Sequence, residues 1–252
     1  MILDIYKDSL EYSLQDGKTL LKLGLTLLFS FLIIPIFFVL GYYYRVLDTS
    51  THGMINGDEK LPDFSDLTSM FVDGLKVFLV KLVYLLIPII ILIITRLIGG
   101  GASNLNSMAG NGIITVGTII SIILAIIFYF LSIMAVANMV AENGSIKAAF
   151  DFKGIFKIIT NIGWLRYIGF YLGLIIIMLL ISIVIGLIIT LLWFAFGLVG
   201  ALAGALGAKV GLILGLIIGF AVYLFFVYPY LTIFESRAVG LIYEPLPESD
   251  EQ

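Results

Sequence analysis

Long uncharged apolar runs alternate along the chain with short segments rich in charge. A helix needs about 20 apolar residues to cross the hydrocarbon core of a bilayer. By that measure the apolar runs predict crossings at 23–44, 77–95, 113–141, 167–195 and 210–234. The predicted fold is therefore all-α, a polytopic transmembrane helix bundle of about five crossings that forms a single membrane domain over residues 1–252.

The run at 167–208 leaves the number of crossings open. It is uncharged throughout and about twice the length of one crossing. Its last part is crowded with Gly and Ala, which suits a tight turn. One long tilted helix followed by a turn is the first interpretation. The alternative is a sixth crossing within 187–206.

The segment LPDFSDLTSMFVDGLK follows the first apolar run. Its apolar residues recur every three or four positions, at Leu61, Phe64, Leu67, Phe71 and Leu75. Asp63, Asp66 and Asp73 fall on the opposite face. This pattern predicts an amphipathic helix over 62–76 that lies in the headgroup plane with its carboxylates in water.

A second segment of this kind follows the third apolar run. Ser145 is a candidate N-cap, and an apolar stripe with outward-facing lysines predicts an interfacial helix over 145–160. The order of crossing, interfacial helix and crossing therefore occurs twice, which indicates a parallel pseudo-repeat of a kind seen in transporters.

The lysines and arginines predict an orientation. With five crossings, one face holds five of them: Lys7, Lys18, Lys22, Arg96 and Lys209. The other face holds the remaining nine of 14 and should be cytoplasmic. We therefore expect a multi-pass protein of the plasma membrane with its N-terminus outside, its C-terminus cytoplasmic and both interfacial helices on the cytoplasmic side.

Composition supports the membrane assignment and excludes several kinds of chemistry. Charged residues make up 12% of the chain, about half the share in a typical soluble domain. The chain has no cysteine and one histidine, His52, which excludes thiolate metal sites, histidine clusters and a Ser-His pair within one chain. A net charge of −3 gives no field that attracts nucleic acid.

Ionisable residues are missing from the centres of the predicted crossings. Such residues usually mark ion coupling or buried catalysis. Glu235 and Arg237, at the inner end of the last crossing, are interpreted as a water-exposed helix terminus. We therefore expect a protein that is not an enzyme and that has no cofactor and no metal site.

Glycines are spaced four apart near the end of the chain, at Gly207, Gly211, Gly215 and Gly219. This spacing makes a flat helix face that another helix can approach closely. Packing within the chain is the first interpretation, for instance against Gly169, Gly173 and Gly186. Self-association into a homo-oligomer is the alternative.

Several motifs resemble a known family. They are GYYYRVL at 41–47, LPDF at 61–64, FVDGLK at 71–76, VYLLIP at 83–88, ANMVAENGSIKAAFD at 137–151 and YPYLTIFESRAVGLIYE at 228–244. In this order they resemble the archaeal integral-membrane family known as domain of unknown function 4013, over essentially the whole chain. The second half more distantly resembles the membrane domain that precedes some glycerophosphodiester phosphodiesterases and carries no catalytic residues. The resemblance implies an archaeal plasma membrane and brings no activity.

The patterned polarity lies at the membrane surface, so we expect function there. The hypothesis is a non-enzymatic protein that organises membrane lipid or a partner protein at the cytoplasmic face. Its candidate interaction face is Arg45, Asp63, Asp66 and Asp73. The three carboxylates do not suggest one metal ion, because Asp63 and Asp73 lie about 15 Å apart along a helix. The alternative is a permease or channel for a neutral or lipid-like solute, suggested by prolines within the crossings and by the glycine face.

Overall fold

The computed structural model describes residues 2–104 and 106–243, and every regular element in that part is helical. In chain order the α-helices are α1 (Ile2–Tyr12), α2 (Gly17–Leu28), α3 (Ile34–Thr51), α4 (Leu67–Ser103), α5 (Ser107–Ala141), α6 (Ile146–Ala149), α7 (Phe152–Ile162), α8 (Trp164–Ala201), α9 (Gly204–Val222) and α10 (Tyr228–Ile242). A 3-10 turn, η1 (Ser30–Leu32), precedes α3, and a π-helical turn, η2 (Tyr223–Val227), joins α9 to α10.

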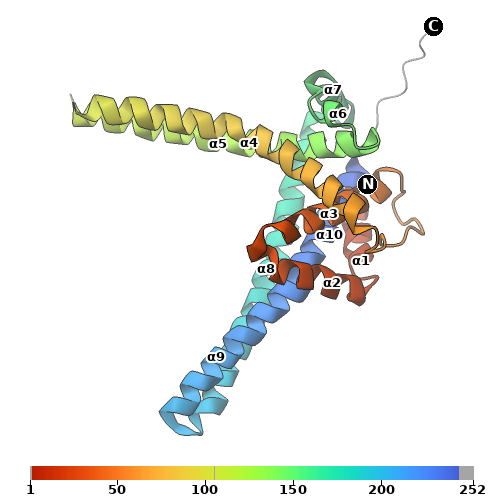
Figure 1. Cartoon of the computed structure of the whole chain (residues 1–252), viewed down its shortest axis with the longest axis vertical. Coiled ribbons are helices and arrows are strands. Elements are labelled where there is room, and N and C mark those ends of the chain that lie inside the picture. Colours follow the sequence, from red (N-terminus) through yellow and green to blue (C-terminus); the bar gives the residue numbers. More distant parts are fainter. Residues whose placement is uncertain (1, 105, 244–252) are drawn as a thin grey trace.

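Two long antiparallel helical hairpins, α4–α5 and α8–α9, extend in different directions from a shared base (Figure 1). We call this base the head: it comprises α1, α2, α3, residues 52–66, α6, α7, α10 and the ends of the long helices that pack on them. Four helical stretches are long and apolar enough to cross a membrane: Leu67–Ser103, Ser107–Ala141, Trp164–Ala201 and Gly204–Ile242. The predicted all-α helical bundle is thus confirmed, and these stretches indicate a multi-pass membrane protein.

The buried core lies in the head, and the outer parts of the hairpins expose apolar side chains. On α4, Val77, Val80 and Tyr84 are buried, whereas most side chains beyond Tyr84 are exposed. Residues 85–103 span about 28 Å at 1.5 Å per residue. That length matches a hydrocarbon core of about 30 Å. The exposed part of this arm therefore has the length and the surface of a membrane-spanning helix.

The range 23–44 is not one continuous helix, in contrast to the prediction. Helix α2 ends at Leu28, the chain turns through η1, and α3 begins at Ile34 after Ile33 adopts a φ of 68°. Pro35 explains the break, because proline has no N–H for the preceding turn and its ring clashes with the carbonyl four residues back. The apolar run therefore forms an elbow that turns back on itself.

The two ends of this elbow meet in the head. The Gln15 side-chain amide donates to the Glu59 carbonyl oxygen at 3.3 Å, and the Leu61 N–H donates to Gln15 Oε1 at 3.2 Å. The Tyr12 hydroxyl donates to the Lys60 carbonyl oxygen at 3.0 Å. The segments before and after the elbow consequently lie side by side.

The range 62–76 is not a separate interfacial helix. Helix α4 begins at Leu67, where the Asp66 carboxylate caps it by accepting from the Ser69 N–H at 3.3 Å, and continues without a break into the first arm. The patterned residues are therefore divided between the loop before α4, which holds Leu61, Asp63 and Phe64, and the first turns of α4, which pack on the head.

The aromatic residues of that apolar stripe contact α3. Phe64 stacks on Tyr42 with ring centroids 5.8 Å apart, and Phe71 meets Phe37 edge-on at 5.3 Å. Because α3 turns back at the elbow, it lies beside α4 and covers the face that the sequence assigned to the membrane surface.

The range 145–160 contains two short helices, α6 and α7, where one was predicted. Ser145 precedes α6 but its side chain makes no capping hydrogen bond, whereas the Asp151 carboxylate caps α7 by accepting from the Gly154 N–H at 3.1 Å. The apolar face of α7 is buried in the head core at Ile155, Ile158, Ile159 and Ile162.

The second arm forms from the long uncharged run. Helix α8 is continuous to Ala201, and the chain turns at Leu202 and Ala203 before α9 begins. The structure thus follows the interpretation of one long helix and a turn, and no separate helix occupies 187–206.

Candidate functional site

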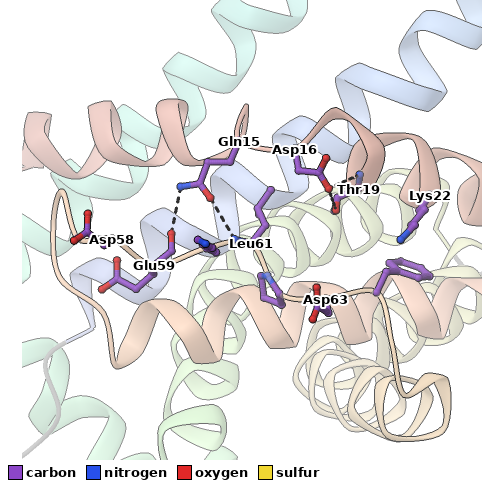
Figure 2. A pocket seen from close by; sticks show the side chains of 12 residues that line it. Gln15, Asp16, Thr19, Lys22, Asp58, Glu59, Leu61 and Asp63 are labelled. Atoms are coloured by element: carbon purple, nitrogen blue, oxygen red, sulfur yellow. Dashed lines mark hydrogen bonds between the residues drawn. The ribbon is translucent and has the colours of Figure 1, made fainter.

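A polar groove of about 560 Å³ opens in the head between the α1–α2 junction and residues 57–64. Its walls are formed by Gln15, Asp16, Thr19, Lys22 and residues 57–64. Figure 2 shows these side chains converging from the α1–α2 turn on one side and from the extended loop on the other.

The backbone around the groove is held in place from both sides. On the loop side, Gln15 binds the carbonyl of Glu59 and the N–H of Leu61 (Figure 2). On the helix side, the Asp16 carboxylate accepts from the N–H groups of Lys18 and Thr19 at 3.0 and 3.1 Å and caps α2. The hydrogen bonds from the Thr19 hydroxyl and from these N–H groups hold the pKa of Asp16 below its usual value.

Four charged side chains of the groove are unpaired. Asp58, Asp63, Lys22 and Lys60 line the groove, are exposed, and form no hydrogen bond or ion pair through their side chains with any other described residue. The groove therefore offers two carboxylates and two ammonium groups to a ligand, on walls that are already ordered.

Arg45, one of the predicted interaction residues, is not free. Its guanidinium donates to the backbone carbonyl oxygens of Asp63 at 3.0 Å, Ser65 and Asp66 at 2.9 Å. Arg45 thus fixes the end of the loop to α3. Sequence reasoning could not see this role, because the acceptors are backbone atoms whose positions depend on the fold.

The three predicted aspartates have different roles. Asp66 caps α4, and Asp73 accepts from the Ser69 hydroxyl at 3.3 Å and pairs with Lys76 at 3.5 Å. Only Asp63 keeps an unpaired carboxylate, and it lies in the groove. The structure therefore brings Arg45, Asp63 and Asp66 together along the loop, while Asp73 lies further along α4.

A buried ion network lies beneath the groove. Arg237 on α10 is fully buried, and its Nε–H donates to Asp8 Oδ1 at 2.7 Å. Its Nη2 group donates to Asp8 Oδ2 at 3.3 Å, to the Met54 carbonyl oxygen at 3.1 Å and to Glu59 Oε2 at 3.0 Å. The guanidinium also lies over the Tyr12 ring, with Cζ 4.5 Å from the centroid.

The prediction of a water-exposed terminus at Arg237 is therefore wrong. The physical reason is that α1 folds against α10 and supplies Asp8 as a counter-charge. A signal was present in the sequence: Asp8 falls on the apolar stripe of the amphipathic N-terminal helix, among Ile5, Ser9 and Tyr12. A carboxylate on the buried face of a helix implies a partner charge elsewhere.

Glu59 connects this network to the groove. Burial raises the pKa of its carboxyl, but hydrogen bonds from the Met54 N–H and from Arg237, together with the charge of Arg237, more than offset that effect and hold the pKa below its usual value. Glu59 is therefore stabilised in its ionised form, and it ties residues 54–59 to α10.

A second cavity, of about 390 Å³, lies at the fork where the two hairpins diverge. Its lining residues come from α5, α8, η2 and α10: Tyr129, Ile175, Met178, Leu179, Ser182, Tyr223, Tyr228, Leu231, Thr232 and Glu235. Glu235 accepts no hydrogen bond from any other described residue, and its Oε1 is buried. Like Arg237, Glu235 does not belong to a water-exposed terminus.

The predicted packing glycines all lie on the face of α9 that meets α8. A Cβ atom at Gly207 or Gly211 would collide with the carbonyl oxygen of Gly200 or Phe196, and one at Gly219 would lie 2.5 Å from Ile189 Cγ2. At Gly215 a Cβ would lie 3.0 Å from the Cα of Trp193. The contact is therefore between neighbouring helices of one hairpin, and it does not involve Gly169, Gly173 or Gly186.

A model of the family described as "Protein of unknown function (DUF4013)" matches residues 27–194. The chain belongs to this family. Comparison with the curated proteins and with the solved structures finds no match.

The DUF4013 match is shorter than the whole-chain resemblance that the motifs indicate. It includes Arg45, the 57–64 wall of the groove and the first arm. Asp8, Glu235 and Arg237 lie outside the matched range. The DUF4013 match identifies the family, and the description of that family assigns no activity to it.

Proposed function

We propose that the protein is a non-enzymatic membrane protein that holds a partner protein at the cytoplasmic face of an archaeal plasma membrane, through the groove of its head. One observation carries the proposal: the groove has an ordered backbone, fixed by Gln15 and Arg45, and four charged side chains without partners. Ordered walls lower the entropy cost of binding. Exposed charges of both signs on these walls favour specificity for a partner segment of complementary charge.

The orientation in this proposal follows from the elbow. If 23–44 turns back, the head with α1 and α10 lies on one side of the membrane and the tips of the two arms lie on the other. Of the 14 basic residues, Arg96 and Lys209 lie in the outer parts of the arms and the remaining 12 lie in the head. Twelve basic residues on one side of the membrane and two on the other are a larger asymmetry than the nine and five of the five-crossing arrangement. Because basic residues concentrate on the cytoplasmic side, this division favours a cytoplasmic head.

A protein segment fits the groove better than lipid does. The groove is lined by charges of both signs and by backbone groups, and it lies between the α1–α2 turn and an extended loop, away from the apolar arms (Figures 1 and 2). A polypeptide can extend across about 560 Å³ and pair with Asp58, Asp63, Lys22 and Lys60 in turn. Binding of lipid headgroups is the competing outcome of the test below.

The test uses a photo-reactive amino acid at Lys60 in membranes of the native host, with crosslinked products identified by mass spectrometry. We expect a defined protein product that is lost in the double variant Asp58→Asn/Asp63→Asn and kept in Glu142→Gln. Glu142 is an exposed carboxylate of the head outside this groove. Products that are unchanged in the double variant, or crosslinks to lipid alone, would refute the proposal.

A second candidate function is a permease for a neutral or lipid-like solute. The observation in its favour is the cavity at the fork, which lies between the two arms. Flux of such a solute into liposomes that contain the purified protein tests it. Flux no faster than in protein-free liposomes would exclude this candidate.

A further inference from the structure

We infer that the cavity at the fork is a binding site for an organic cation of the ammonium type, with Glu235 as the counter-charge and tyrosine rings as the walls. The inference is independent of the proposed docking function of the head. It rests on an unpaired carboxylate, on the aromatic residues around it and on the volume and lining of the cavity.

The carboxylate of Glu235 lacks a direct partner. Neither of its oxygens accepts a hydrogen bond from the described residues, and no described lysine or arginine forms an ion pair with it. Arg237, two positions along α10, uses its Nε and Nη2 groups for Asp8 and Glu59 and forms no ion pair with Glu235. A carboxylate in the apolar base of a membrane helix is costly to leave unpaired, and such residues usually mark functional sites.

The basic side chain that acts on Glu235 electrostatically is directed elsewhere. Lys81 on α4 attracts Glu235 electrostatically, but its Nζ lies over the Tyr43 ring, 4.7 Å from the centroid, and forms no ion pair with Glu235. Lys81 does not line the cavity. The cavity side of Glu235 is therefore left for a cation from outside the chain.

The π-helical turn places two tyrosines on one wall. The Tyr228 N–H donates to the Tyr223 carbonyl oxygen, an i to i+5 hydrogen bond that closes one π turn. In a regular α-helix, residues five apart point in different directions, whereas one π turn brings them to the same side. Pro229 favours this irregularity because it cannot donate the next α-helical hydrogen bond.

Tyr129 of α5 adds a third tyrosine to the lining, so aromatic side chains from α5, η2 and α10 meet at the cavity. Tyrosine rings attract cations through their negative faces, and cages of aromatic rings with a carboxylate are a common way to hold quaternary ammonium groups. The floor is apolar, with Ile175, Met178, Leu179 and Leu231. This combination suits a cation with a hydrocarbon body.

Other ligand classes fit less well. A divalent metal ion prefers several oxygen ligands with more than one carboxylate, and among the described residues Glu235 is the only carboxylate in the lining. An anion would be repelled by Glu235. A volume of about 390 Å³ lies within the range of small-molecule sites.

The experiment measures binding of choline and of its neutral isostere 3,3-dimethylbutan-1-ol to the full chain in nanodiscs of phosphatidylglycerol, by calorimetry. We expect choline to bind about tenfold more tightly than the isostere, since only choline gains the charge interactions. We expect Glu235→Gln to remove that difference. Equal binding of the two probes to the unaltered protein would overturn the inference, and this comparison needs no variant to fold.

Two variants test the walls and the role of Lys81. The double change Tyr223→Leu/Tyr228→Leu should weaken choline binding about tenfold, whereas Tyr228→Phe should leave it nearly unchanged because the ring face remains. Lys81→Gln should preserve or tighten choline binding. Loss of binding in Lys81→Gln, with the protein still folded by circular dichroism, would show that Glu235 serves Lys81 and would overturn the inference.

The ammonium group has two sources, a soluble amine or a lipid headgroup. Nanodiscs that contain phosphatidylethanolamine distinguish them. Weaker choline binding in these nanodiscs than in phosphatidylglycerol alone assigns the site to an amine-bearing lipid, and equal binding assigns it to a soluble amine. Both outcomes are consistent with an ammonium site. The comparison of choline affinity with the affinity of its isostere decides whether that site exists.

Discussion

Arg237 and Asp8 are 229 positions apart in the chain, yet the Arg237 guanidinium donates two hydrogen bonds to the Asp8 carboxylate, at 2.7 and 3.3 Å. This pair joins the first and last described helices. Through Glu59 the same guanidinium also holds the loop that walls the groove. The buried Arg237 guanidinium therefore links α1, the 54–59 segment and α10 in the head.

Removing this cation should destabilise the head strongly. Arg237→Met leaves Asp8 and Glu59 without their partner, and breaking a buried ion pair from one side costs about 3–5 kcal/mol. We expect a loss of that size in the free energy of unfolding, measured by denaturation in mixed detergent micelles. Lys7→Gln, on the exposed face of α1, is the matched control and should change stability by less than about 0.5 kcal/mol. Similar stability of the two variants would contradict the role of the network.

The depressed pKa of Glu59 predicts an acid-sensitive contribution to stability. Because the folded pKa lies below that of the unfolded chain, about 4.3, the contribution is fully present above that value and is lost as the pH falls through the folded pKa. We expect the stability difference between the unaltered protein and Glu59→Gln to shrink on acidification below about pH 4.3. A difference that is constant from pH 7 to pH 3 would argue against the ionised network.

Packing of the second arm depends on the absence of a side chain at Gly211. Gly211→Ala should lower stability by about 1–3 kcal/mol, since its Cβ would meet the Phe196 carbonyl oxygen. Gly186→Ala on α8 has open space around the new Cβ and should be neutral or stabilising by up to about 1 kcal/mol. Thermal unfolding of both variants in one detergent tests this, and equal effects would contradict the close α8–α9 contact.

Arg45 should control the order of the groove. Arg45→Lys retains the charge but cannot make three directed bonds to the carbonyls of Asp63, Ser65 and Asp66. We expect hydrogen exchange in residues 57–66 to rise several-fold, with exchange in α7 unchanged. Lys60→Gln, whose side chain has no partner among the described residues, should leave exchange in the loop nearly as it is. Unchanged exchange in Arg45→Lys would contradict its role as the anchor of the loop.

The sequence was most informative where apolar length decides the structure. The apolar runs that form α4, α5 and α8 are long. In an apolar environment a helix satisfies the hydrogen bonds of their backbone N–H and C=O groups within the segment itself. The sequence failed at 23–44, because a proline and one residue with positive φ turned an apolar run of the right length into an elbow. Length alone does not distinguish these outcomes.

The candidate site was predictable only in part. Asp63 has an exposed side chain that lines the groove, but it lies in the loop before α4 and not on a helix face as the sequence predicted. The ion network of Asp8, Glu59 and Arg237 and the cavity around Glu235 depend on contacts between segments far apart in the chain. No local pattern reveals such contacts, although a carboxylate on the buried stripe of α1 was a hint.

Labelling of single cysteines in intact cells tests whether the segments before and after the elbow both lie in one head, on one side of the membrane. The natural chain has no cysteine, so Lys18→Cys, Asp58→Cys and Asn104→Cys can each be labelled in intact cells with a membrane-impermeant maleimide. We expect labelling at position 104 and protection at both 18 and 58. Labelling at position 18 together with protection at 58 would place the two ends of the elbow on opposite sides of the membrane and rule out a single head.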